Sequence, residues 1–487
     1  MPSDRKAVRA FSGMGPFTRL WCGHVVSLVG NSALRFAFIV QAWTNSERAT
    51  PVVLLSLCAV VPEILLSPVA GALIDRVSKR TALQFADLGG LTVVAVLGLL
   101  QLVATLHTWQ IYVTVALLGA CAAFQNPALL SAVPLLVRKD QYQRANGLIS
   151  SARTGSEICG PALGGLVIAL SGIGTIIWLD LASFVVALTV VRVTRFGATD
   201  TGDAADTGAV AASDDAAASA DTSTSTHADA GESEAPPRRG ILAESLDGLR
   251  VLFTRPGLRA LVVVSSAANL VMVTGFAVIP PMVLARSGGS SGTLAAVTTC
   301  MGVGGLGGGL MTAAWGGPRR RARGMMLGIV GMCVSAQIGM AAAHSALGWC
   351  TAILLGALLM PVVNSSFQSI LQAEVEERLQ GRVFGAEAFL SDLSVPVAMG
   401  ISGPLADRVF EPQARTHSGV TGVLAPVVGE GRGSGMAALL LLAGVCGVVV
   451  ALWGLARRPV RALDAAGADD ASGDMAVPVK NEKAPQH

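Results

Sequence analysis

The stretch Gly71-Ala72-Leu73-Ile74-Asp75-Arg76-Val77-Ser78-Lys79-Arg80 decides the architecture of this 487-residue chain. It begins as the end of a long apolar run and closes with one acid and three cations before the next apolar run starts. A helix needs about 20 mostly apolar residues to cross the hydrocarbon of a bilayer, and both flanking runs, 51–74 and 82–105, are that long. The stretch therefore predicts a short loop between two membrane-spanning helices.

The rest of the chain repeats this pattern. Hydrophobic residues make up 52% of it and charged residues only 14%, whereas a soluble protein carries roughly 25% charged residues. Much of the surface must therefore face lipid, and the runs are too long for the strands of a barrel. We predict an all-α membrane protein with twelve spans at 18–42, 51–74, 82–105, 108–132, 145–170, 173–194, 258–284, 292–315, 324–344, 347–371, 383–406 and 434–456.

The placement of Lys and Arg predicts the orientation of these spans. Cations concentrate in the loops 75–80, 137–144 and 318–323 and directly after the last span, whereas the loops near 106, 172 and 345 carry none. The loop 407–433 carries three arginines, but its length makes it a weak determinant of topology. We expect a multi-pass protein of the plasma membrane with both termini in the cytoplasm.

A repeat at a constant offset of 238 residues relates the two ends of the chain. It places Asn31 on Asn269, Gly71 on Gly309 and Gly147 on Gly385, at equivalent points of the spans. Two parallel six-helix halves of this kind enclose a substrate cavity between them. The predicted divisions are an N-terminal half at 1–196, a disordered acidic cytoplasmic linker at 197–240, a C-terminal half at 241–460 and a disordered cytoplasmic tail at 461–487.

The loop sequence resembles the cytoplasmic signature of the major facilitator superfamily, G-x-L-a-D-R-x-G-R-R, with Ser78 where glycine is usual. In that family the cluster latches the two halves together on the cytoplasmic side. Asp75 could pair with cations or with the positive N-terminus of a facing helix, although an ordinary positive-inside loop is the alternative. The repeat has Ala313 in place of Asp75, so a latch would be asymmetric. The resemblance implies a latch formed by Gly71, Asp75, Arg76, Lys79 and Arg80.

The fifth span carries a second motif. It resembles the antiporter motif of drug-exporting members, G-x8-G-x3-G-P-x2-G-G, with Ser156 replacing one glycine. The resemblance implies export, but general packing of small residues between membrane helices is the alternative. Exporters of this type often have an arginine in span four, and 117–127 contains none, so the usual arginine does not supply proton coupling. The antiporter-like residues are Gly147, Ser156, Gly160, Pro161, Gly164 and Gly165.

Gly403-Pro404-Leu405-Ala406-Asp407-Arg408 at the outer end of span eleven completes the motifs. With it, the pattern is similar to the siderophore-exporter and macrolide-efflux branch of the superfamily, including enterobactin exporters. The resemblance covers nearly the whole chain apart from the linker and the tail.

Charged side chains within the spans are expected to face the bundle interior or a water-filled cavity, because each costs about 2.5–3.5 kcal/mol in lipid. Glu63 either carries the coupled proton or forms a standing ion pair with Arg35. Arg153 and Glu157 stand four residues apart and either neutralise each other or take part in transport. Glu387 belongs to the same group, and Asp87 and Asp180 lie nearer span ends. The candidates for cargo or proton binding are Asn31, Arg35, Glu63, Arg153, Glu157, Asn269 and Asp392, with Asn31 and Asn269 expected to face each other across the cavity.

These features predict a secondary active transporter, acting as a monomer, that exports amphipathic small molecules such as antibiotics, siderophores or related metabolites by proton coupling. An importer of a small metabolite on the same fold is the alternative. A membrane enzyme is disfavoured because the six histidines are dispersed and no catalytic cluster is visible. The eight cysteines are scattered singly, which disfavours a metal site. We expect no cofactor and no nucleic-acid partner.

Overall fold

The computed structural model describes residues 14–74, 76–103, 106–138, 141–194, 250, 252–375 and 377–464, without the side chains of 72 and 377–382. Asp75, the predicted linker and nearly all of the predicted tail lie outside the described residues. Every regular element within the described ranges is helical, and twelve segments are long and apolar enough to cross a membrane. The predicted all-α class and the twelve spans are confirmed.

The first six spans are single helices, some interrupted by proline. Proline is tolerated inside membrane helices because neighbouring helices satisfy the freed carbonyl groups; Pro62 and Pro68 are examples in the second span. The bounds are α2 (Gly15–Ser46), α3 (Ala49–Ile74), α4 (Lys79–Val103), α5 (Thr108–Leu136), α6 (Tyr142–Ser171) and α7 (Ile173–Val193).

The second group of six spans is less regular. The ninth span contains a π-helical turn, η2 (Cys333–Gly339), between α12 (Arg321–Met332) and α13 (Met340–Ala342). Here the buried amide of Gln337 donates a 3.0 Å hydrogen bond to the Met272 carbonyl. The remaining elements are α9 (Pro256–Ala277), α10 (Ile279–Arg286), α11 (Ser291–Trp315), α14 (Ala346–Glu374), α15 (Glu377–Leu405), η3 (Ala406–Phe410), α16 (Glu411–Arg415), α17 (Gly419–Val428) and α18 (Ser434–Ala456).

The segment 407–433 differs from the prediction. We expected a loop, but helix continues from α15 through η3 into α16, and α17 follows as a separate short helix. Thr421 and Val428 of α17 are buried, whereas Val423 is 79% exposed. The uncharged sequence 418–429 thus forms a helix with one packed and one open face, which a search for spans of about 20 residues misses.

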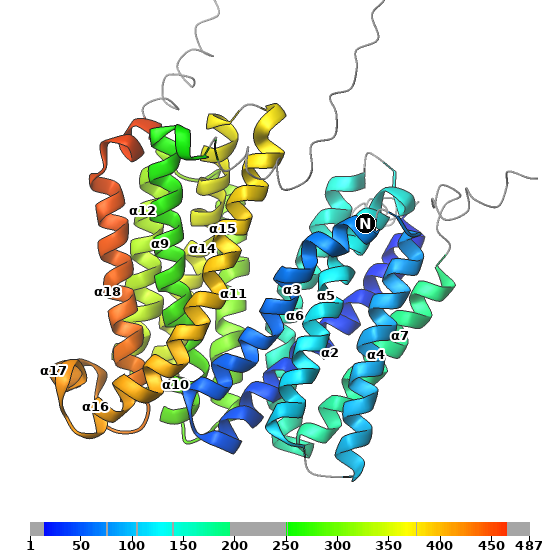
Figure 1. Cartoon of the computed structure of the whole chain (residues 1–487), viewed down its shortest axis with the longest axis horizontal. Helices are drawn as coiled ribbons and strands as arrows, with labels where there is room; N and C mark the ends of the chain where they lie inside the picture. Colours follow the sequence, from blue (N-terminus) through cyan, green and yellow to red (C-terminus); the bar gives the residue numbers. More distant parts are fainter. Residues whose placement is uncertain are drawn as a thin grey trace, which may run out of the picture.

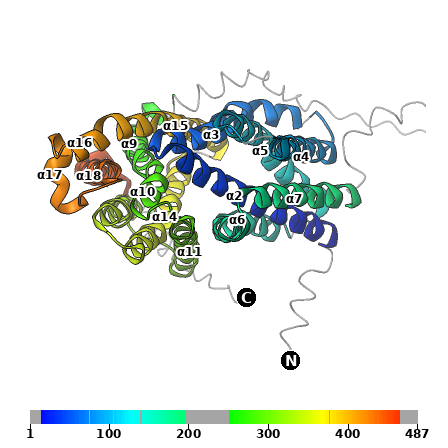
Figure 2. The same cartoon turned by 90° about the horizontal axis from the view of Figure 1, so that it is seen from below.

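The helices gather into two groups that lie side by side, α2–α7 and α9–α18 (Figure 1). Two seams join the groups: α6 packs on α11, and α3 packs on α15. The view along the bundles shows both seams between the groups (Figure 2). We call the end of the molecule with the loops 76–78, 137–138 and 316–320 and with residues 457–461 after α18 the basic end. The end with the loops 47–48, 287–290, 343–345 and 429–433 is the far end.

The two ends are packed differently. At the far end a single hydrophobic cluster joins both groups, from Phe36 and Trp43 of α2 to Met282 and Met436. At the basic end the core is divided into two clusters. One contains residues between 14 and 191 only, and the other residues between 252 and 463 only. The halves are therefore closed against each other at the far end and separate at the basic end (Figure 1).

Candidate functional site

Three predicted residues line one small pocket inside the first group of helices. Asn31 and Arg35 come from α2 and Glu63 from α3, and apolar residues of α5 complete the wall around a cavity of about 30 Å³. The Asn31 side-chain oxygen is buried without a hydrogen-bond partner. Glu63 is half-buried, and Arg35 is exposed although it lies within the bundle. A polar pocket of this size has room for roughly one or two water molecules, so within an apolar bundle it is the leading candidate for a proton site rather than for a cargo site.

Four charged side chains act on one another around this pocket. The Arg35 guanidinium lies within the electrostatic reach of Glu63 and Glu157, which attract it, and of Arg153, which repels it. The ion pairs within 4 Å among the described residues lie elsewhere, near the helix ends. No such pair joins these four residues. Their formal charges sum to zero, so the cluster is balanced without either acid being held in a tight ion pair.

The glycines of the antiporter-like motif pack α6 against two neighbouring helices, α2 and α11. A Cβ at Gly164 would lie 2.9 Å from the Phe36 ring of α2, and one at Gly160 would overlap Ser32 of α2. Gly165 instead faces the other group, where a Cβ would lie 2.7 Å from the Cβ of Ala295 in α11. These glycines allow close contact both within the first group and across the α6–α11 seam.

The surroundings of the other three residues of the motif, Gly147, Ser156 and Pro161, differ from those of the packed glycines. Gly147 lies in open space, so a Cβ there would meet nothing within 4 Å. The Ser156 hydroxyl donates a 2.7 Å hydrogen bond to the Arg153 carbonyl of its own helix, and Pro161 is buried inside α6. Ser156 thus satisfies its hydroxyl within α6, as expected for a serine in an apolar environment.

The candidates of the second group lie on α9 and α15. The Asn269 amide donates to the Ser394 hydroxyl at 2.7 Å and to the Ser391 carbonyl at 3.3 Å. Glu387 accepts a hydrogen bond from Ser391, and Asp392 is exposed. The structure therefore brings Asn31 and Asn269 into separate surroundings, one within each group, rather than into contact with each other.

The predicted latch residues make contacts inside the first group. Lys79 donates a 2.7 Å hydrogen bond to the Ile74 carbonyl at the end of α3, and Arg80 donates one of 2.7 Å to the Arg192 carbonyl near the end of α7. Cations at helix C-termini satisfy carbonyls that have no partner in the helix. Gly71 has open space beside it, and Arg76 is exposed.

Two carboxyls are more deeply buried than the sequence suggests. Asp87 is 3% exposed and accepts a 2.6 Å hydrogen bond from Gln125 of α5. Asp180 is fully buried beside Gly30 of α2; it accepts a hydrogen bond from Ser183, and its second oxygen has no partner. Sequence reasoning missed these partners, since nothing in the spacing links α4 to α5 or α7 to α2.

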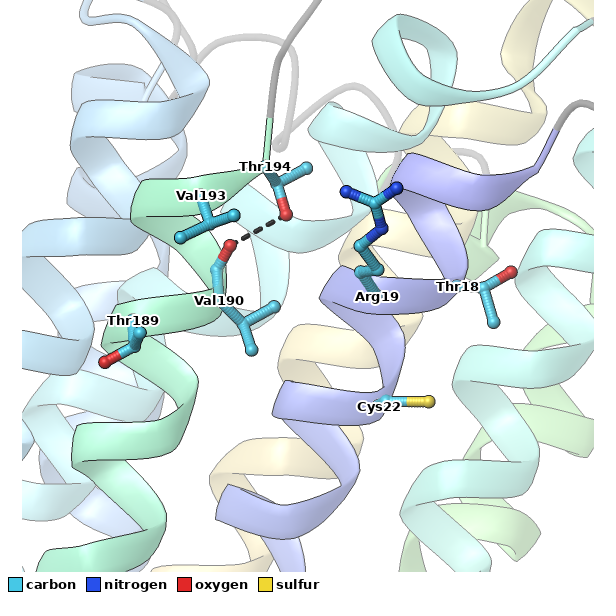
Figure 3. Close-up of a pocket in the computed structure, with 7 residues that line it drawn as sticks. All are labelled: Thr18, Arg19, Cys22, Thr189, Val190, Val193 and Thr194. Atoms are coloured by element: carbon cyan, nitrogen blue, oxygen red, sulfur yellow. Dashed lines mark hydrogen bonds between the residues drawn. The ribbon is translucent and has the colours of Figure 1, made fainter.

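A different pocket opens between α2 and α7 at the basic end (Figure 3). Its lining is Thr18, Arg19, Cys22, Thr189, Val190, Val193 and Thr194, which includes none of the predicted site residues. The Thr194 hydroxyl is already bonded to the Val190 carbonyl (Figure 3). The charged pocket at Arg35 and Glu63 therefore stays the candidate site.

The model of the Major Facilitator Superfamily matches residues 20–399, most of the chain. The chain belongs to the major facilitator superfamily. Curated relatives include macrolide efflux protein A of Streptococcus pyogenes, 24% identical over 399 residues that cover 81% of this chain and 90% of that protein. The multidrug efflux pump Tap of Mycolicibacterium fortuitum is 23% identical, with 81% of this chain and 90% of that protein covered.

Solved structures share the fold. A bacterial homologue of the human lysosomal transporter Spinster, in an inward-facing and unoccupied conformation, matches with a TM-score of 0.61 at 13% identity and covers 94% of this chain and 98% of its own. The nucleoside transporter NupG matches with a TM-score of 0.61 at 9% identity, with 91% and 98% covered. These structures show the fold, and the family match makes the chain a multi-pass membrane transporter of small molecules.

Proposed function

We propose that this transporter exports amphipathic small molecules, such as antibiotics, siderophores or related metabolites, in exchange for protons. The observation that carries the proposal is the balanced group of Arg35, Glu63, Arg153 and Glu157, which lies inside the bundle with no ion pair closer than 4 Å. A carboxylate in such a group can take up a proton without breaking a tight pair. Protonation would leave a net positive group and change the attraction between α2, α3 and α6.

The direction of transport is supported by two independent features. The relatives named above are efflux proteins, one for macrolides and one for several drugs. Gly160, Gly164 and Gly165 of the antiporter-like helix α6 allow it to pack closely on α2 and α11. Close helix packing of this kind leaves little room for ions or solutes to leak between the helices.

The same proposal includes the orientation and a gate. Both termini lie in the cytoplasm, so that the basic end faces inward, and the protein works as a monomer. Gly71, Asp75, Arg76, Lys79 and Arg80 form an inner latch that engages when the basic end closes. In that state Asp75 meets the N-terminus of the facing helix of the other half.

Accumulation of a labelled panel of macrolides, other antibiotics and siderophores tests the proposal in cells with and without the protein. Lower accumulation in producing cells, which a protonophore abolishes, is the expected result. Higher accumulation in producing cells would establish import instead. Lower accumulation that a protonophore leaves unchanged would retain export and refute proton coupling.

A further inference from the structure

One contact between the halves is made by a carboxylate at a helix terminus. Asp407, in η3 directly after α15, accepts hydrogen bonds from the first two amides of α3. The Ala49 N–H lies 2.9 Å from Oδ1, and the Thr50 N–H lies 2.7 Å from Oδ2. The carboxylate thus uses both oxygens to cap a helix of the opposite half.

Helix α3 has no cap of its own. The residue before it is Arg48, whose side chain contains donors only. The first amides of a helix have no partner within the helix, and the third residue is Pro51, which has no N–H. Asp407 therefore satisfies both amide donors of the first three residues, and its charge is favourable at the positive end of α3.

The approach of the two helices depends on a glycine. A Cβ at Gly403, one turn before Asp407, would lie 2.8 Å from the Cα of Thr50. A side chain at 403 would therefore force α15 and the start of α3 slightly apart. The exposed pair of Arg432 with Glu47 joins the same two halves at the rim, but such exposed pairs contribute little. Gly403 and Asp407 together form the close contact at the far end of the seam.

The sequence around Asp407 matches the inner latch. Gly403-Pro404-Leu405-Ala406-Asp407-Arg408 and Gly71-Ala72-Leu73-Ile74-Asp75-Arg76 both follow G-x-L-x-D-R. Helices α3 and α15 run in opposite directions along the same seam, so the two sequences lie at its opposite ends. At the 238-residue offset the counterparts are Ala169 for Asp407 and Ala313 for Asp75. Asp407 therefore belongs to the α3–α15 seam and Asp75 directly follows α3 in the sequence, whereas the equivalent positions in the sequences of α6 and α11 are alanines.

We propose that Asp407 is the gating residue of the far end, where its cap on α3 holds the halves closed. The cap by Asp407 and the inner latch at Asp75 form in different conformations. When the two halves rotate against each other, the α3–α15 seam closes at one end and opens at the other. This inference rests on the alternating access and orientation of the proposed function. It does not depend on cargo, direction or coupling ion.

The test measures the conformation of the full chain in lipid nanodiscs without cargo. In a background with the eight native cysteines replaced, spin labels at Thr175 and Ala346 report the far end, and labels at Gln143 and Arg320 report the basic end. All four positions are exposed.

Asp407→Ala is expected to raise the ratio of far-end-open to far-end-closed molecules about tenfold, since two charge-assisted bonds are lost. Asp407→Asn keeps one acceptor oxygen, so we expect a smaller shift in the same direction.

Asp464 offers a matched control. Its carboxylate accepts from the Ala322 amide at 2.8 Å and the Arg323 amide at 3.2 Å, and so caps α12 in the same way, but within one half. Asp464→Ala should leave both distance distributions unchanged. Equal shifts in the Asp407 and Asp464 variants, or no shift at Asp407→Ala and Asp407→Asn, would overturn the proposal. No cargo is present in this measurement, so its outcome does not depend on whether the export assay succeeds or fails.

Discussion

At the scale of single residues, the neighbours of Glu63 decide what its carboxylate can do. Two unit charges at 4 Å near a protein surface attract by roughly 4 kcal/mol, and the attraction falls with distance. Glu63 has no cation within ion-pair distance among the described residues, yet its charge acts on Arg35. The Glu63 carboxylate is therefore not held in a tight ion pair, which makes it the first residue to test as the carrier of the coupled proton.

Glu63→Gln should abolish efflux driven by a pH gradient. The amide has nearly the same shape but carries no titratable proton, so cargo binding should persist while coupling is lost. Purified protein in liposomes with an imposed pH gradient gives the measurement, with cargo binding measured separately. We expect the gradient-driven rate to fall by about a hundredfold or more, the usual contribution of a proton-transfer group.

Glu430→Gln is the control for this variant, since Glu430 is exposed in the loop before α18 and forms an exposed ion pair with His417 at 3.8 Å. It should transport at the rate of the parent protein. Full gradient-driven efflux by Glu63→Gln would mean that the coupled proton is carried elsewhere, and Asp87 and Asp180 would be the next residues to change.

At the scale of helices, the antiporter-like motif of α6 contains glycines with different roles. Gly160 fits against Ser32 of α2 with no room for a side chain, whereas Gly147 faces open space. Gly160→Ala should lower the free energy of unfolding by about 1–3 kcal/mol, as overpacking does. Gly147→Ala should leave it unchanged or raise it by up to about 1 kcal/mol, because alanine favours helix. Thermal unfolding in detergent compares the two variants, and similar losses at both positions would contradict this division of the motif.

How far the sequence predicts the structure also differs between elements. The twelve spans follow from hydrophobic length alone, because lipid forces every backbone group to pair within its own helix. The contacts of the site do not follow in that way. Charge and depth single out Arg35, Glu63 and Glu157, but their proximity depends on how α2, α3 and α6 pack. The hydrogen bond from Gln337 to Met272 and the cap by Asp407 likewise cannot be predicted from one sequence, since each joins residues far apart in the chain.

At the scale of the whole molecule, the far end is closed by one shared core and the basic end is divided between two. Transport by alternating access requires the far end to open. The α3–α15 seam offers a way to prevent this, because a Cβ at Gly403 would lie 3.5 Å from the Cβ of Thr50. That distance is at the short end of the disulfide range of about 3.5–4.5 Å, so the small separation that a side chain at 403 forces on the helices still leaves the two Cβ atoms within bonding range. With the native cysteines replaced, the double variant Thr50→Cys/Gly403→Cys should form a crosslink under oxidising conditions.

The oxidised double variant should lose nearly all transport and regain it on reduction, measured as cargo flux in liposomes before and after a reducing agent. The matched control is Gly339→Cys/Ala352→Cys, where the two Cβ atoms would also lie 3.5 Å apart but within the second half. Its crosslink should leave flux unchanged, because each half moves as a unit when the seam opens. If the oxidised Thr50–Gly403 crosslink formed quantitatively and flux continued, the far end would not need to separate at this seam. The pathway would then have to open along α6 and α11 instead.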